Sequence, residues 1–268
     1  MTDRVITDIA DGVAEVRLNR PDKHNALDQA MFDGIVEAGR ALLDRGDVRA
    51  VVLHGDGPSF CSGLDYPSFM QSGQGLESAF QKLPDEPANA AQYTAMVWRR
   101  LPMPVIVAIH GAAFGGGLQL ALGGDIRLAA PDARLSIMEV KWGLIPDMAA
   151  TVTLKDVVGL DVAKELTFTG RVVDGATAAD LRLVTRTEDD PLGAARALAA
   201  EIATKSPDSV RGAKRLFQTA WAIDEDAALA EEARMQQALI GSPNQMEAVQ
   251  AALAKRPGNF RDPESGAG

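Results

Sequence analysis

HGAAFGGGLQLALGGD, at residues 110–125, is the stretch that decides the fold of this chain. The apolar run VIVAI precedes it, and the residues after its three consecutive glycines suit a buried helix. The pattern predicts a strand that runs through a glycine turn into a helix. Glycines let a ligand approach the main chain closely, and the free N–H groups of a first helical turn favour an anion or a developing oxyanion. A simpler alternative is that Gly115, Gly116 and Gly117 only allow the helix to pack tightly on the strand.

A second glycine-containing loop follows another apolar run. Residues 50–55 read AVVLHG, which is typical of a strand buried on both faces, and GPSFCSGLD follows at residues 57–65. Cys61 in this loop has no basic neighbour within a few positions that would lower the pKa of its thiol. We therefore expect Cys61 to be a small buried residue and no nucleophile.

Composition and charge exclude several classes of function. The chain has 268 residues, 46% of them hydrophobic, so it can bury a large core and still carry a helical appendage. A net charge of −10 argues against a nucleic acid or an anionic membrane as partner. One Cys and three His give no disulfide and no cluster of metal ligands, so no metal is expected. Neither an export signal nor a membrane span is visible, which predicts a cytoplasmic protein.

The amino-terminal region has the pattern of a hairpin followed by a loop and a helix. Two strand-like runs, at residues 5–9 and 13–18, flank Asp11 and Gly12, which suit a tight turn. A polar loop follows, in which Lys23 and His24 are candidates to meet an anionic ligand or are simply solvated. Asp28 then suits the cap of an amphipathic helix.

Residues 137–147, IMEVKWGLIPD, place two carboxylates eight positions apart in mostly apolar company. A carboxylate in such surroundings has a raised proton affinity and can exchange a proton near neutral pH. The alternative is structural, with Glu139 paired to Lys141 or to a distant Arg and Asp147 capping a helix that begins near Met148. The stretch at residues 66–91 has little periodicity and suits a lid or a pocket wall.

The composition becomes alanine-rich and helical from about residue 192 onward. Amphipathic patterns predict three long helices there, each with one apolar face. Such helices at the end of an α/β core often dock a neighbouring subunit. We therefore expect two parts, a core at residues 1–191 and a helical region at residues 192–268.

Four motifs in this order and spacing resemble the crotonase (enoyl-CoA hydratase/isomerase) family: FCSGLD at 60–65, HGAAFGGGLQLA at 110–121, EVKWGLIP at 139–146 and TGR at 169–171. The resemblance covers nearly the whole chain. It implies an α/β fold, a crotonase-like core of repeated ββα units in two sheets with a helical carboxyl-terminal region. It also implies an acyl-CoA thioester as substrate, no cofactor besides the coenzyme A of that substrate, and a homotrimer or a dimer of trimers.

The same resemblance assigns roles to individual residues. The main-chain N–H groups of Ser62 and Gly116 would form an oxyanion hole for the thioester oxygen. Physically, such fixed donors stabilise the charge that appears when a proton leaves the neighbouring carbon. Further positions match residues that contact the substrate or cover its nucleotide end: Lys23, Ala26, Gly63, Leu64, Asp65 and Gly115 for contact, and Lys255, Arg256 and Phe260 for the cover.

One departure from the family pattern decides which reaction we predict. Hydratases of the family carry two acidic residues, and the first of these positions is Gln119 here, whose amide cannot take a proton from water. Asp147 instead lies where dienoyl-CoA isomerases carry an acidic residue. We therefore predict double-bond isomerisation of an enoyl-CoA or dienoyl-CoA in fatty-acid metabolism. Glu139 would be the base, Asp147 the second acid–base group, and Gln119 would orient substrate or water.

Two alternatives stay open on the sequence. Asp147 could replace the missing carboxylate and activate water, which would make the protein an enoyl-CoA hydratase. The chain could also bind acyl-CoA without turnover, although a pure binder has no need for Glu139.

Overall fold

The computed structural model describes residues 3–72, 80–84 and 86–263. Within these residues, one sheet has six strands in the order β1 (Val5–Ala10), β2 (Val13–Leu18), β3 (Ala50–Gly55), β4 (Val105–Ile109), β6 (Ile126–Ala129), β9 (Arg186–Thr187). A smaller sheet has three, in the order β5 (Ala112–Phe114), β7 (Arg134–Ser136), β8 (Val173–Asp174). The helices of the core are α1 (Gln29–Leu43), α2 (Tyr66–Ser72), α3 (Ala90–Arg100), α4 (Gly116–Leu122), α5 (Ala150–Thr153), α6 (Leu160–Thr169), α7 (Gly175–Asp180) and α8 (Pro191–Ala203). The helices of the carboxyl-terminal part are α9 (Pro207–Ala220), α10 (Glu225–Leu239) and α11 (Pro243–Leu253).

The amino-terminal hairpin forms as predicted. Strands β1 and β2 pair antiparallel, and Asp11 and Gly12 both have positive φ, at 51° and 76°, as a tight hairpin turn requires. From β2 onward the large sheet is parallel. The carboxyl ends of its strands therefore share one edge.

The two central strands are buried on both faces, and alternate residues serve different cores. Val51, Leu53 and the odd-numbered residues of β4 pack with α1, α3 and α4 in the main core. Val52 and Ile106 face the other way and pack with α8. The side-chain period of two along a strand produces this division.

From β4 to β7, consecutive strands along the chain alternate between the two sheets. β4 lies in the large sheet, β5 in the small one, and α4 follows; β6 and β7 repeat the change of sheet. The predicted α/β fold of repeated ββα units in two sheets is confirmed. Its consequence is that the loop between β4 and α4 lies where the two sheets meet.

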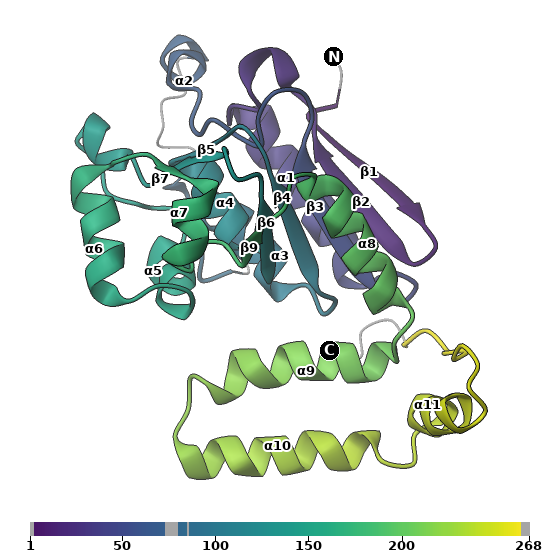
Figure 1. Cartoon of the computed structure of the whole chain (residues 1–268). Coiled ribbons are helices and arrows are strands. Elements are labelled where there is room, and N and C mark those ends of the chain that lie inside the picture. The colour runs from purple at the N-terminus through teal and green to yellow at the C-terminus, as the bar shows by residue number, and fades with distance from the viewer. Residues whose placement is uncertain (1–2, 73–79, 85, 264–268) are drawn as a thin grey trace.

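Helix α8 belongs to the core, which moves the boundary between the two parts of the chain. Ala195 and Ala199 are fully buried against the sheet, and Figure 1 shows α8 lying across its face, opposite α1 and α3. The predicted boundary at residue 192 would cut this helix. The structure places it in the turn before α9 instead.

Helices α9 and α10 form an antiparallel pair beyond the end of the sheet (Figure 1). Lys214 on α9 fixes the pair to the core, because its ammonium donates to the carbonyl oxygens of Trp98 (3.3 Å) and Met103 (3.0 Å) and pairs with Asp125 (2.7 Å). Helix α10 has no buried residue, and Leu229 on it is 58% exposed. These helices therefore leave apolar surface uncovered within this chain.

The carboxyl-terminal tail lies at the opposite end of the sheet from the loops after β3 and β4. Arg49, just before β3, donates to the carbonyl oxygen of Phe260 and pairs with Asp262, both at 3.0 Å. Arg256 pairs with Glu247 of α11. Within this chain, Lys255, Arg256 and Phe260 therefore do not lie over the site whose nucleotide end they were predicted to help cover.

No helix in the described part of the chain is both long and apolar enough to cross a lipid bilayer.

Candidate active site

Three loop segments lie side by side at the carboxyl edge of the large sheet. Leu27 forms an isolated parallel bridge with Leu64, and Cys61 forms another with Ala113 of β5. The loop after β3 is thereby held between the loop before α1 and the strand that leads into α4. Residues far apart in sequence are brought to one place by these backbone pairings.

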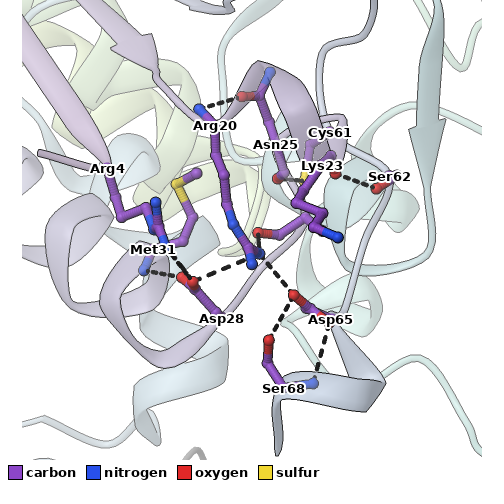
Figure 2. A network of polar contacts seen from close by, with 11 residues as sticks. Arg4, Arg20, Lys23, Asn25, Asp28, Met31, Cys61, Ser62, Asp65 and Ser68 are labelled. Atoms are coloured by element: carbon purple, nitrogen blue, oxygen red, sulfur yellow. Dashed lines mark hydrogen bonds and ion pairs between the residues drawn. The ribbon is translucent and has the colours of Figure 1, made fainter. Parts of the chain in front are cut away.

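Arg20 fixes two of these segments to each other (Figure 2). Its guanidinium is buried, pairs with Asp65 at 2.8 Å and with Asp28 at 3.5 Å, and donates to the Ala26 carbonyl oxygen. Asp65 also accepts from the N–H and hydroxyl of Ser68. Although burial alone would raise the pKa of Asp65, its bonds to Ser68 and Arg20 outweigh this and lower it. The network holds the loop geometry and is itself turned away from the cavity described below.

The predicted oxyanion donor in the first loop is wrong by two residues. The N–H of Ser62 donates to the His24 carbonyl oxygen at 2.9 Å, so it has no free donor for a ligand. In the parallel bridge, Leu27 bonds to the two residues that flank Leu64, namely Gly63 and Asp65. The N–H of Leu64 consequently points to the side away from Leu27.

Leu64 and Gly116 carry amides without a hydrogen-bond partner among the described residues. Gly116 is the first residue of α4, where an N–H group has no intrahelical acceptor. A Cβ placed on Gly63 would lie 3.7 Å from the Gly116 nitrogen, so the two loops touch at this point. Both donors therefore belong to the two loops in contact at the glycine turn that was predicted to bind an oxyanion, and both residues line the cavity described next.

Two glycines of the turn are required by their surroundings. Gly115 has φ +52°, and a Cβ there would lie 3.2 Å from the Glu139 carboxylate. A Cβ on Gly117 would collide with the Cys61 carbonyl of the neighbouring loop. Close packing thus explains Gly117, whereas Gly115 leaves room for a functional side chain.

A cavity of about 170 Å³ opens beside these amides. Glu139 and Asp147 line it, together with residues of the two loops: Ser62, Gly63, Leu64, Gly115 and Gly116. The rest of the wall is largely apolar and comes from several elements: Phe32, Tyr66, Phe80, Phe114, Met138, Trp142, Leu144 and Met148. The rings of Tyr66 and Trp142, which are far apart in sequence, stack with centroids 6.0 Å apart. The cavity suits an apolar group that carries one polar oxygen.

Glu139 is held by a buried amide. Its side-chain Oε1 accepts from Nε2 of Gln119 at 2.5 Å, and Oε1 of Gln119 accepts from the Met148 N–H at 2.8 Å. The Oε2 atom of Glu139 is buried and has no partner among the described residues. One oxygen of this carboxylate is therefore fixed, and the other is buried with no hydrogen-bond partner among the described residues.

Both cavity carboxylates have a raised proton affinity. Burial raises the pKa of Glu139, and the charge of Asp147 adds to this while the Gln119 bond opposes it. Burial also raises the pKa of Asp147. The structural alternative does not hold, because no Lys or Arg among the described residues pairs with Glu139, and the helix after Met148 has no side-chain cap. Both groups fit acid–base chemistry.

The family model for enoyl-CoA hydratase/isomerase matches residues 8–263. The chain belongs to this family. A "Delta(3,5)-Delta(2,4)-dienoyl-CoA isomerase, mitochondrial" from Mus musculus is 35% identical over 94% of this chain and 79% of its own length. A "Probable enoyl-CoA hydratase" from Bacillus subtilis (strain 168) is 34% identical over 89% of this chain and 93% of its own length.

Solved structures agree with this assignment and with the crotonase fold. An enoyl-CoA hydratase from Bacillus anthracis superposes with a TM-score of 0.86 at 28% identity, covering 96% of this chain and 98% of the other. A probable enoyl-CoA hydratase/isomerase from Mycobacterium abscessus has a TM-score of 0.85 at 31% identity, covering 97% and 99%. Solved relatives named as a hydratase and as a hydratase/isomerase thus share the fold of this family member.

Not every residue predicted to contact the substrate reaches the cavity of this acyl-CoA enzyme. Gly63, Leu64 and Gly115 line it, whereas Asp65 is used by Arg20 and Ser68. Lys23 is exposed and Ala26 is buried, and neither is part of the lining. Gln119 is fully buried behind Glu139, so the structure does not bring it to the place where it was predicted to orient substrate or water.

Two features of the site were missed from the sequence. The free amide at Leu64 depends on its bridge to Leu27, which no local pattern indicates. Met148 contributes the N–H that fixes Gln119, and its backbone role is equally invisible in the sequence. By contrast, Cys61 behaves as predicted, since burial raises the pKa of its thiol to about 12 and its Sγ donates to the Asn25 carbonyl oxygen.

Proposed function

We propose that this family member isomerises the double bond of an enoyl-CoA or dienoyl-CoA by proton transfer. The observation that carries the proposal is the distribution of acidic groups. Two carboxylates, Glu139 and Asp147, come from one segment and line the cavity, while the position behind them is the neutral amide of Gln119. Moving a double bond needs groups that remove and return a proton, and it needs no activated water.

The steps follow from the contacts in the cavity. The thioester oxygen accepts from the N–H groups of Leu64 and Gly116, which stabilise it as it gains negative charge; a donor of this kind is worth about 3–4 kcal/mol. Oε2 of Glu139 takes a proton from C2 of a 3-enoyl chain, and the C–H electrons delocalise onto the thioester oxygen. As the electrons return, the double bond forms between C2 and C3, and Glu139 or Asp147 gives a proton to C4. In a 3,5-dienoyl chain the proton returns at C6.

Outside the cavity, the nucleotide end of coenzyme A needs positive charge for its phosphates. Lys23 is exposed in the loop beside the oxyanion amides and is suited to that contact. We propose Lys23 as a contact for a phosphate of coenzyme A. Ala26, in the same loop, stays a proposed substrate contact.

A panel of three substrates tests this function. The purified protein is incubated with crotonyl-CoA, a 3-enoyl-CoA and a 3,5-dienoyl-CoA, and products are followed by absorbance and mass. We expect the 3-enoyl-CoA and the 3,5-dienoyl-CoA to be converted without a gain of 18 Da. The rate should exceed that of a Glu139→Gln control by about two orders of magnitude or more. Faster loss of crotonyl-CoA with formation of 3-hydroxyacyl-CoA would contradict it.

Hydration is the second candidate, and one observation favours it. Asp147 lines the cavity without a bond to another residue's side chain among those described, so it is free to hold a water molecule. The same panel decides between the two, since only hydration adds water to the product. Binding of all three thioesters without any product would instead support a non-catalytic acyl-CoA binder.

We further propose that copies of this chain associate as a homotrimer or a dimer of trimers. Large apolar side chains on α9, α10 and α11 are exposed, among them Phe217, Trp221, Leu229 and Leu253. Light scattering on the purified protein should give about three or six times the mass of one chain. A monomer at all concentrations would contradict this proposal without bearing on the chemistry.

A further inference from the structure

The orientation of the Gln119 side-chain amide is dictated by its neighbours. The Met148 N–H can only donate, so the Gln119 atom that faces it at 2.8 Å is the carbonyl oxygen. The NH₂ group must then point the other way, to Oε1 of Glu139 at 2.5 Å. Gln119 is fully buried and lies outside the cavity wall, so this arrangement is closed to solvent.

The same amide connects both acidic groups of the site. Met148 directly follows Asp147, so Gln119 bonds to the peptide group that joins them and to the carboxylate of Glu139. Oε1 of Glu139 is occupied by this contact, whereas Oε2 is buried and unpartnered among the described residues. A carboxylate with one oxygen held in this way has a single atom left for a substrate proton.

We infer that Gln119 is a positioning residue that holds Glu139 with Oε2 toward the substrate, favours the ionised form of its carboxylate by donating to Oε1, and fixes the Asp147–Met148 peptide to the same amide. The inference rests on the proposed function, in which Glu139 is the base. It replaces the expectation that Gln119 touches substrate or water.

A carboxylic acid at position 119 would reverse this effect. Its one oxygen would still accept from the Met148 N–H, but the other would face Oε1 of Glu139 at hydrogen-bond distance. Two carboxylates this close cannot both ionise, so they would share one proton and titrate as a pair. Glu139 would then remain protonated at a pH where the native enzyme has a free base.

The test measures the titration of Glu139 directly in the full-length protein without substrate. Glutamate side-chain carboxyls are labelled with ¹³C, and the Glu139 signal is assigned by its loss in Glu139→Gln. In Gln119→Glu we expect its midpoint to rise by at least about one pH unit. Asn244→Asp is the matched control, because the Asn244 amide is also buried and donates to a carboxylate, Asp208 at 2.8 Å, but it lies on α11. There the Glu139 midpoint should not move.

A second variant covers the case in which Gln119→Glu does not fold. Gln119→Met has similar length and no polar hydrogen, so Glu139 loses the donor to its charged form and its midpoint should again rise, by a smaller amount. A Glu139 midpoint within about 0.3 units of the wild type in every folded Gln119 variant would overturn the inference.

Kinetics separate this inference from the proposed function. In Gln119→Glu the acidic limb of kcat/KM for the 3,5-dienoyl-CoA should move to higher pH by the same amount as the carbon signal, with KM nearly unchanged at high pH. A shifted titration in a protein that shows no isomerisation at all supports the positioning role and contradicts only the function. An unchanged Glu139 titration in a protein that does isomerise the substrate would support the proposed function and contradict the positioning role.

Discussion

Glu139 and Asp147 are eight residues apart in one segment and line the same cavity, yet their surroundings differ. Glu139 is 8% exposed and bound through Oε1 to an amide that is itself fixed. Asp147 is half-buried, and no other side chain among the described residues bonds to it. Positioning, more than acidity, therefore distinguishes the two groups, because burial raises the pKa of both.

The largest effect should come from removing the fixed carboxylate. Glu139→Gln keeps the shape and can still accept from Gln119, but it cannot take a proton. We expect kcat for isomerisation to fall by about 10²–10⁴-fold with little change in KM. Steady-state kinetics on the preferred substrate measure this. A smaller loss of kcat in Glu139→Gln than in Asp147→Asn would contradict the assignment of Glu139 as the main base.

The pH dependence should follow the same group. Glu139 acts in its deprotonated form, so kcat/KM should fall by about tenfold per pH unit below its pKa, which lies above the ordinary 4.5 of a glutamate. A profile from pH 4 to 9 locates the midpoint. A flat profile down to pH 4.5 would show that no buried carboxylate carries the proton.

Removing Asp147, the carboxylate without a side-chain partner among the described residues, should have a smaller effect with a distinct signature. Asp147→Asn should lower kcat by about 10-fold, since Glu139 can still return the proton itself. Because the Asp147 charge raises the pKa of Glu139, the acidic limb should also move to lower pH. A limb that stays in place, or moves up, would mean that the two carboxylates do not interact.

The smallest effect concerns stability. A carboxylate whose native pKa is raised costs stability as pH rises through that pKa, because the unfolded chain ionises more easily. The gain in melting temperature on Glu139→Gln should therefore be larger at pH 7 than at pH 4.5. The same difference should be smaller for Asp147→Asn, since Asp147 is nearer to water. Thermal unfolding at the two pH values checks both signs. Equal pH-dependent changes in melting temperature for the two variants would contradict the stronger effect of burial on Glu139.

The sequence was sufficient for the framework of the site because that framework is local. Apolar runs of strand length and the glycines after them predicted β3, β4 and the turn into α4. The apolar neighbours of Glu139 and Asp147 indicated carboxylates of raised proton affinity as one of two interpretations, and both residues line a largely apolar cavity. Patterns with a period of two or a glycine signal need no knowledge of distant partners.

The errors all involve contacts between segments far apart in sequence. The resemblance placed the oxyanion donor at Ser62, whose N–H is instead used by the His24 carbonyl, 38 positions away. The tail at Phe260 was assigned to the site, but Arg49 holds it at the other end of the sheet. Gln119 was expected to face the substrate, and only the Met148 N–H shows which way its amide is turned.

The most direct test of the central claim is a crystal structure with a bound, unreactive CoA thioester analogue. The account predicts the thioester oxygen at about 2.7–3.2 Å from the nitrogens of both Leu64 and Gly116, with Oε2 of Glu139 beside C2 of the acyl chain. An oxygen held elsewhere, or a Glu139 carboxylate turned away from C2, would contradict it.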